Sequence, residues 1–523
     1  MEASAKSGHD LNAVNTGIES TLHRLVHLCR RRNLFASPLL CLPTELILKI
    51  FVCAAIEIES DDNRPVLVLT AICHKLREIA VASPELWGTV DLITPPIAEL
   101  FLERCKYDPH TLRRSSTTSE RRSKAKYLVG DPRRDALWEK LKDYTFDGLQ
   151  SIIFEGTQHE FVIGVAGILR KAPNVSNLEI INIRSRPGLS WPVNDPLSNL
   201  STLRVHKFWI SWDSPLLRNL TQLVMSLSPF SRPSVPTSIE MFLTALANCP
   251  NLEILNLTHV GPDSLDGLQD NCDMVVQLRR LQDLRLGFSD PSRIGYILSH
   301  IECPESAQLV VQVTAEIHYD LLETISKILP HRNIQTSQHF RKSEAIAICS
   351  GYRHFHFSTH NLLVNFEEPS GNFAYRVTHH VLAQLASKIL EVIGGDTTTS
   401  LHIGSWRIDP PHEMWRVLLH GLPRLERVCY HLRGVEEDRE FVNPLIFVFS
   451  LPFEGEPVCP RLQHLEIPKR ILTQDTSAVW LERILTERDA SGRRLRRIGL
   501  SGNATEGDWL VLEPFRHLVD EVR

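Results

Sequence analysis

The histidines come nearest to the spacing of a reactive site. His354 and His356 are two residues apart, so a strand would place both on one face, and His360 follows closely. Such a pair could bind a metal ion. However, no cysteine or acid stands at ligand spacing beside them, and some clustering is expected in a chain with 23 histidines. We therefore expect neither a metal nor another cofactor.

Other motifs that could support catalysis are incomplete. His412-Glu413 lacks the second histidine of an H-E-x-x-H helix, because His420 comes eight residues after the first. Gly394 and the two residues after it follow a helical pattern and lack the lysine of a phosphate-binding loop, which is typical of a helix end. No G-x-S-x-G nucleophile motif occurs. We expect that the chain is not an enzyme.

The eleven cysteines do not form a framework either. They are scattered from Cys29 to Cys459 without any C-x-x-C pair, which argues against both disulfide bonding and a zinc ribbon. Reduced, mostly buried thiols are the expected state.

Composition and length limit the class of protein. With 523 residues, 43% apolar and 23% charged, the chain can bury a large core and form two to four domains or one repeat array. A formal net charge of −5 provides no basic field, so we expect no nucleic-acid partner. No apolar run reaches the roughly 20 residues of a membrane helix and no signal-peptide core is evident, so we expect no membrane partner and a cytoplasmic or nuclear location.

The N-terminal region, residues 1–40, contains one amphipathic helix. Apolar residues recur at steps of three and four from Ile18 to Leu28, and the pattern ends near Arg30, Arg31 and Arg32. The arginines suit a helix C-terminus, and a nuclear-import signal is the alternative interpretation.

Residues 41–90 predict a compact unit of three helices. Leu42, Leu46 and Ile50 are spaced by four, and Pro43 stands at the first turn of their helix. After a polar break, residues 69–79 predict a second helix with steps of three and four, and Ser83 is placed to cap a short third helix that starts at Pro84.

Three sequence blocks of this unit resemble an F-box of the fungal type. They are L-P-x-E-L-x-x-x-I-F from Leu42, C-H-K-L-R-E-I from Cys73, and S-P-E-L-W ending at Trp87. The chain departs from the family at Leu76, where tryptophan is usual, and in an acidic insertion at residues 57–62. The resemblance implies a module that docks on the adaptor of a cullin-RING ubiquitin ligase. The implied contacts are Leu42, Pro43, Glu45, Leu46, Ile50, Phe51, Leu86 and Trp87. The alternative is that these side chains pack on the rest of the chain.

Beyond the module, short strands alternate with helices, which predicts an α/β fold. Residues 91–145 form a connecting unit, in which the segment 108–135, rich in Ser, Thr and Arg, is expected to be a disordered loop. The motifs Arg114-Ser115 and Arg122-Ser123 in this loop could be phosphorylated by basophilic kinases.

Residues 146–523 carry a degenerate repeat. The window L-x-x-φ-x-φ, where φ is apolar, starts at Leu178, Leu200, Leu220, Leu252, Leu281, Leu425, Leu462 and Leu495. A Pro-x-Leu string precedes three of these strands, and a helical pattern precedes it at residues 239–247 and 412–420. This region resembles the leucine-rich repeats behind many F-boxes, with residues 301–400 assigned by continuity. We therefore expect an irregular leucine-rich-repeat-like α/β solenoid.

The resemblances together imply a substrate-recognition subunit of an SCF-type ubiquitin ligase that catalyses nothing itself. Its partners would be the adaptor, through it a cullin scaffold, and an unknown protein substrate. A scaffold or interaction protein not coupled to ubiquitination is the alternative. Side-chain alternation along the strands selects a candidate substrate surface, in which recurring arginines suit acidic or phosphorylated segments. It comprises Asn182, Arg184, Arg204, His206, Asn256, Thr258, Asp283, Arg285, Arg427 and His431.

Overall fold

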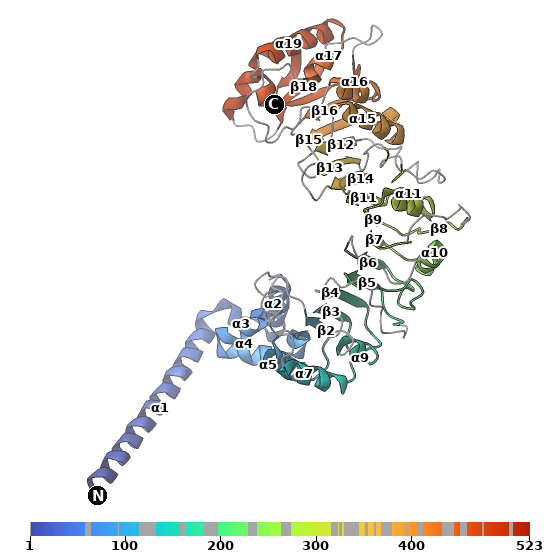
Figure 1. The fold of residues 1–523 in the computed structure, drawn as a ribbon. Coiled ribbons are helices and arrows are strands. Elements are labelled where there is room, and N and C mark those ends of the chain that lie inside the picture. The colour runs from blue at the N-terminus through green and yellow to red at the C-terminus, as the bar shows by residue number, and fades with distance from the viewer. Residues whose placement is uncertain are drawn as a thin grey trace. The chain divides into compact units, whose positions relative to one another are not determined.

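The protein is described from a computed structural model with mixed α/β architecture (Figure 1). The structure describes residues 2–57, 64–92, 94–114, 132–156, 164–182, 197–228, 238–262, 273–314, 323, 327–328, 345–350, 354–359, 362–367, 379–393, 395–404, 412–430, 444–449, 458–472, 475–501 and 506–522. These residues form two compact units, the first within 1–184 and 192–200 and the second within 185–191 and 201–523. The expected division at residue 145 therefore falls inside the first unit.

The first unit begins with helices. They are α1 (Glu2–Ala36), η1 (Pro38–Cys41), α2 (Thr44–Glu57), α3 (Arg64–Ile72), α4 (His74–Ala82) and η2 (Pro84–Trp87). Pro43 precedes α2, and its carbonyl oxygen accepts hydrogen bonds from the backbone nitrogens of Leu46 and Ile47, both at 3.1 Å. The proline thus starts the helix from just outside it.

The second predicted helix is divided in two, so that prediction was wrong. Cys73 separates α3 from α4 with an extended backbone, φ −157° and ψ 167°. Arg77 joins the two helices across this corner, since its Nε donates to the carbonyl oxygen of Thr70 at 2.7 Å. The apolar spacing continues through the corner, which is why the sequence pattern did not show the break.

The predicted Ser83 cap is also wrong in detail. The Ser83 side chain makes no capping bond to η2. Its Oγ instead donates to the carbonyl oxygen of Ile79 at 2.8 Å, and so closes the last turn of α4.

Four parallel strands complete the first unit. These are β1 (Thr89–Asp91), β2 (Thr111–Arg114), β3 (Ser151–Gly156) and β4 (Asn177–Asn182), paired in chain order. They are connected through α5 (Pro95–Arg104), α7 (Pro132–Lys142) and α9 (Ala166–Leu169).

The predicted disordered loop at 108–135 is therefore wrong at both ends. Strand β2 contains buried Leu112, and α7 begins at Pro132. Within this predicted loop, residues 115–131 lie outside the described part of the chain.

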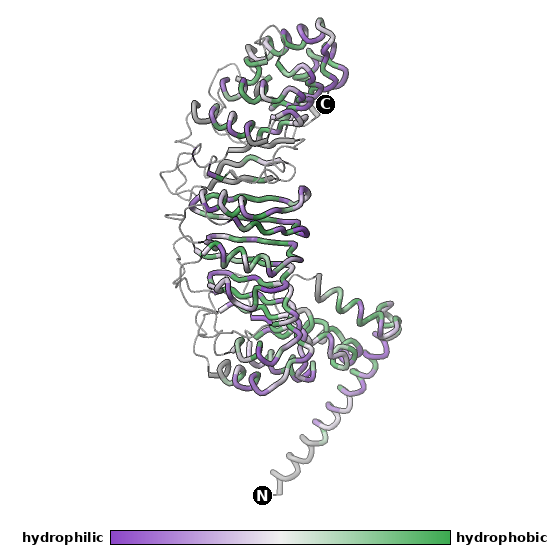
Figure 2. The backbone as a smooth tube through the Cα atoms, turned by 90° about the vertical axis from the view of Figure 1, so that its right-hand side faces the viewer, coloured by the Kyte–Doolittle hydropathy of each residue, from purple (hydrophilic) through white to green (hydrophobic). Residues whose placement is uncertain are grey.

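The second unit carries parallel strands on both sides of a short antiparallel section. The first set is β5 (Thr202–His206), β6 (Gln222–Ser226), β7 (Ile254–Thr258), β9 (Asp283–Phe288) and β11 (Gln308–Thr314), with the small pair β8 (Val276–Gln277) and β10 (Ile301–Glu302). The second set is β15 (Ser400–Gly404), β16 (Arg427–Tyr430), β17 (His464–Pro468), β18 (Leu495–Ser501) and β19 (Val519–Val522). Figure 2 shows hydrophobic stretches along many of these strands.

The middle section does not follow the chain in order, contrary to the expected continuity over 301–400. It comprises β12 (Ala345–Ser350), β13 (His354–Thr359) and β14 (Leu362–Glu367). Strand β14 pairs with β11 in parallel, β13 lies antiparallel between β14 and β12, and β12 pairs with β15 in parallel. The spatial order is therefore β11, β14, β13, β12, β15.

Helices connect the strands of the second unit. They are α10 (Ile239–Ala247), α11 (Pro291–Ser299), α15 (His379–Ile393), η4 (Gly395–Thr397), α16 (His412–His420), α17 (Pro444–Phe449), α18 (Lys469–Leu472), α19 (Asp475–Ala490) and η5 (Glu506–Leu518). Helices α10 and α16 match the predicted bounds 239–247 and 412–420.

The predicted position of the Pro-x-Leu string just before the strands is confirmed, since β7 and β17 begin two residues after Leu252 and Leu462. Leu252 donates its backbone N–H to the carbonyl of Cys249 and Leu462 donates to Cys459, both at 3.1 Å, and both leucines are buried.

Candidate partner-binding surfaces

One side of the N-terminal module is apolar and exposed. We call Leu42, Leu46 and Ile50 the apolar ridge; their exposed fractions are 37%, 45% and 43%. Two further predicted contacts, Pro43 and Glu45, are exposed beside it. The four-residue spacing places Leu46 and Ile50 on one face of α2, and Leu42 lies two residues before this helix in extended backbone.

The adjacent side of α2 fills the interior of the module. Ile47 and Phe51 are each 1% exposed, and they are buried with Leu76 and Ile79 of α4. Because the apolar face of α2 is broad, the module can bury one part of it and still expose the other.

Three predicted adaptor contacts lie inside the unit and are withdrawn from the candidate surface. Phe51, Leu86 and Trp87 are 1%, 6% and 2% exposed. The Trp87 indole Nε1 donates to the carbonyl oxygen of Ala80 at 2.7 Å, and its ring meets Phe101 edge to face at 4.8 Å between centroids. These side chains hold η2 against α4 and α5.

A second exposed apolar pair lies on α3. Val68 and Ile72 are one helical turn apart and each is 60% exposed. Neither residue was among the contacts predicted from the sequence. The four-residue spacing of Val68 and Ile72 is visible in the sequence. Which face of α3 points outward, however, depends on where α4 begins.

The candidate substrate surface of the second unit is a row across adjacent strands. The pairing places Arg204, Val224, Asn256, Arg285 and Val310 side by side. These residues are at least partly exposed, whereas the alternate residues of each strand are buried, as predicted.

Several members of this surface are engaged by neighbours. His206 Nδ1 lies 2.8 Å from Ser226 Oγ, and Arg285 Nη2 lies 2.8 Å from Asp283 Oδ2. Thr258 lies in the next row toward the strand ends, beside Ser226. Because Asp283 neutralises Arg285, Arg204 carries the less compensated charge of the two arginines.

One predicted member faces the wrong way. Asn182 of β4 shares a strand face with buried Leu178 and Ile180. It is itself only 6% exposed, so it lies on the core face. Arg184 and His431 lie outside the described residues.

A cationic row, which sequence analysis found only in part, crosses the C-terminal strands. The register places Arg427, His464 and Arg497 next to one another on β16, β17 and β18. Neighbouring strands lie about 4.8 Å apart, so the three groups fit within roughly 10 Å. Each of these residues comes two positions after the leucine that starts its L-x-x-φ-x-φ window. This common position in the repeat was the sequence signal for the row.

The electrostatics of the cationic row reflect this closeness. Burial lowers the pKa of His464, and the positive charges of Arg427 and Arg497 lower it further. Arg497 Nε lies 3.3 Å from Glu521 at the far end of the row. The charge of the row therefore comes from its two guanidinium groups, and Glu521 offsets part of the charge of Arg497.

The thiols near this row are poor nucleophiles. Burial, reinforced by Glu466, raises the pKa of Cys429 to about 12, and burial raises that of Cys459 to about 12. A thiol is reactive as the thiolate, so neither group supports catalysis.

Within the described residues, no three His, Cys, Asp or Glu side chains are grouped to hold a metal ion. His354 and His356 lie on β13, and His360 is outside the described residues. None of the helices that the structure describes has the length and apolar character needed to cross a membrane.

No family model matches the chain, and no curated protein matches it significantly.

Proposed function

We propose that this protein is the substrate-recognition subunit of an SCF-type cullin-RING ubiquitin ligase. Residues 42–88 would act as an F-box-like module that binds the adaptor, and the strands of the second unit would act as a leucine-rich-repeat-like solenoid that binds a protein substrate. In this assembly the chain positions a substrate and leaves the chemistry to other subunits. We propose a cytoplasmic or nuclear location.

The apolar ridge is the observation that carries the proposal. The module buries Ile47, Phe51 and Trp87 and still leaves Leu42, Leu46 and Ile50 exposed. Complete burial of a leucine-sized side chain contributes about 1.5 to 3 kcal/mol, and covering the part of each ridge side chain that is still exposed contributes about 1 kcal/mol. The ridge also coincides with the block L-P-x-E-L-x-x-x-I-F that carries the resemblance.

The adaptor test uses the double variant Leu46→Asp/Ile50→Asp in the full chain. Both side chains are partly exposed, so the free protein should stay folded, whereas a complex would have to bury two carboxylates. We expect binding to purified adaptor to weaken at least 100-fold. The matched control is Lys75→Asp/Ala82→Asp, which puts two aspartates on exposed positions of α4 and should bind normally. Normal binding by the ridge variant would refute the adaptor assignment.

The substrate class follows from the cationic row and from Arg204. Guanidinium groups bind carboxylates and phosphates bidentately, so we propose a substrate with an acidic or phosphorylated segment. The variant Arg427→Glu/Arg497→Glu should lose captured substrates while keeping the adaptor. Its control is Arg424→Glu/Arg461→Glu, which makes the same charge change at exposed turn positions just before β16 and β17. An unchanged set of captured proteins would refute the surface without affecting the adaptor claim.

A second candidate function is an interaction protein that is not coupled to ubiquitination. It is favoured by the continuity between the module and the sheet: β1 starts two residues after Trp87, and the Trp87 ring packs on Phe101 of α5. Such packing suits a unit that caps the end of a repeat array. Failure of the wild-type chain to bind the adaptor, with substrates still captured, would select this candidate.

A further inference from the structure

Helix α1 is exposed over a long stretch of its described side chains. It runs from Glu2 to Ala36, about 52 Å at 1.5 Å per residue, and every side chain from Ala13 to Arg32 is exposed. Helices in proteins owe most of their stability to the packing of an apolar face. A helix of this length therefore needs a surface that covers its apolar side.

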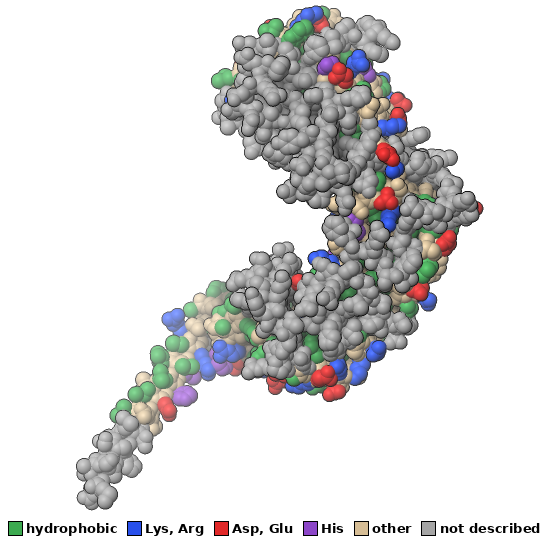
Figure 3. Space-filling view, viewed as in Figure 1, with side chains coloured by type: hydrophobic (Ala, Val, Ile, Leu, Met, Phe, Trp, Pro, Cys, Tyr) green, Lys and Arg blue, Asp and Glu red, His purple; other side chains and the backbone are tan. Residues whose placement is uncertain are grey.

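The apolar side of α1 follows a heptad period. Alternating steps of four and three residues from Val14 define a series of seven positions, of which five are apolar. The positions are Val14, Ile18, Thr21, Leu25, Leu28, Arg32 and Phe35. The apolar members are 53% to 81% exposed. Figure 3 shows hydrophobic side chains along this helix. A repeat of 3.5 residues is the pattern of a helix that pairs with another helix.

The charge of α1 selects the kind of partner. Between Ala13 and Ala36 the helix has four arginines, Arg24, Arg30, Arg31 and Arg32, and a single acid, Glu19. Arg32 occupies a core position of the heptad. We propose that α1 forms a coiled coil with an acidic amphipathic helix of another protein, whose carboxylates pair with these arginines.

Two other occupants fit the helix less well. A second copy would add four more arginines to an already basic helix, and a parallel in-register pair would place Arg32 against Arg32. A membrane surface favours a continuous apolar face; Leu22 and Val26 widen the apolar side of α1, but Thr21 and Arg32 interrupt it. Both occupants remain distinguishable outcomes of the test below.

The test measures binding of a labelled peptide to the full chain by fluorescence anisotropy. The peptide has four heptads with leucine at the two core positions and glutamate at the flanking positions; its twin carries lysine instead of glutamate. The disrupting variant is Ile18→Asp/Leu25→Asp. The matched control, Ser20→Asp/His27→Asp, makes the same changes seven residues apart on the opposite side of the helix.

We expect the glutamate peptide to bind at least 10-fold more tightly than the lysine twin, a difference of about 1.4 kcal/mol. The disrupting variant should lose at least 10-fold in affinity for the glutamate peptide, and the control should stay within about 3-fold of wild type. Equal binding of the two peptides, or no binding, overturns the proposal. Sedimentation showing self-association that Ile18→Asp/Leu25→Asp removes would assign a second copy instead. Binding to anionic phospholipid vesicles without peptide binding would assign a membrane. The adaptor assay uses the apolar ridge, so its result is independent.

Discussion

Trp87 distinguishes a core residue from a contact residue, and two substitutions separate these roles. Trp87→Ala removes a ring that is 2% exposed, and emptying such a site costs about 3 to 5 kcal/mol. Trp87→Phe keeps most of the ring but loses the indole hydrogen bond to Ala80. That carbonyl still accepts from the backbone nitrogen of Ser83 at 3.3 Å, so we expect a smaller cost of about 1 to 2 kcal/mol.

Hydrogen exchange of the amides in residues 74–87 is the suitable assay, because a chain with two units need not unfold in one step. A loss of 3 kcal/mol corresponds to roughly 100-fold faster exchange when local opening limits it. The alanine variant should therefore exchange at least 100-fold faster, and the phenylalanine variant about 10-fold faster. Leu46→Asp should leave exchange nearly unchanged while losing the adaptor. If Trp87→Phe exchanged like wild type yet failed to bind the adaptor, Trp87 would be a contact residue and the burial argument would fail.

Three further predictions concern the buried polar groups. Arg488 donates to the carbonyl oxygens of Val458, Cys459 and Leu462 at 3.1 to 3.2 Å, so Arg488→Met should cost about 3 kcal/mol in urea unfolding of the second unit, and a cost below 1 kcal/mol would contradict this role. Burial lowers the pKa of His110, His259, His420 and His464, so the unfolded chain binds more protons than the folded chain near pH 6. The free energy of unfolding should therefore fall as the pH drops from 7.5 to 5.5, and a free energy that did not change with pH would contradict these shifts. Iodoacetamide at pH 7.5 should label the exposed thiols Cys29, Cys41 and Cys53 first, and Cys429 and Cys459, whose pKa is raised by burial, last. Mass spectrometry that found the reverse order would refute the burial of Cys429 and Cys459.

The α/β class and several elements could be read from the sequence because local signals determine them. The Pro-x-Leu string marks the approach to β7 and β17, which begin two residues after Leu252 and Leu462, and the bounds of α10 and α16 follow from apolar periodicity. Alternation in β7 and β9 correctly separated the inward leucines from Asn256 and Arg285.

The inward face of α2 could not be read in the same way. The helix has one broad apolar face, and both Leu46 with Ile50 and Ile47 with Phe51 satisfy a four-residue spacing. Only the position of α4 decides which pair is buried.

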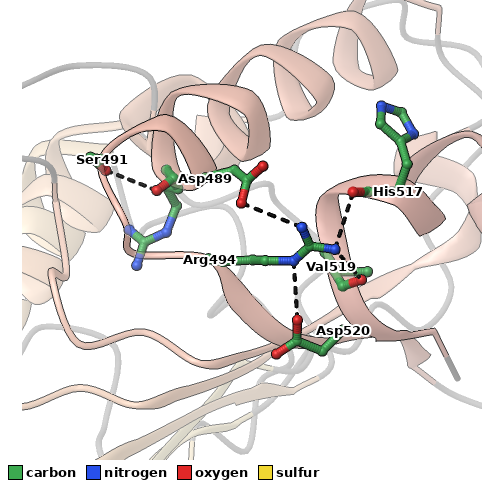
Figure 4. A network of polar contacts seen from close by, with 7 residues as sticks. Asp489, Ser491, Arg494, His517, Val519 and Asp520 are labelled. Atoms are coloured by element: carbon green, nitrogen blue, oxygen red, sulfur yellow. Dashed lines mark hydrogen bonds and ion pairs between the residues drawn. The ribbon is translucent and has the colours of Figure 1, made fainter.

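The roles of the C-terminal arginines also depend on tertiary structure. Arg488 is buried, whereas Arg494, six residues later, joins α19 to the last strand (Figure 4). Its guanidinium lies 3.4 Å from Asp489 and 3.1 Å from Asp520, and it donates to the carbonyls of His517 and Val519. Nothing in the local sequence separates these arginines from the exposed Arg496.

The reversed order of β12, β13 and β14 sets a sequence of events for the growing polypeptide. Strand β11 ends at Thr314, but its partner β14 begins only at Leu362. Until then, the free edge of β11 exposes backbone groups that other strands can pair with. Strand β12 is synthesised first and has the same direction as β14, so it is the nearest wrong partner. During synthesis, β12 can therefore pair wrongly with β11 until β13 and β14 fold back and β14 occupies this edge.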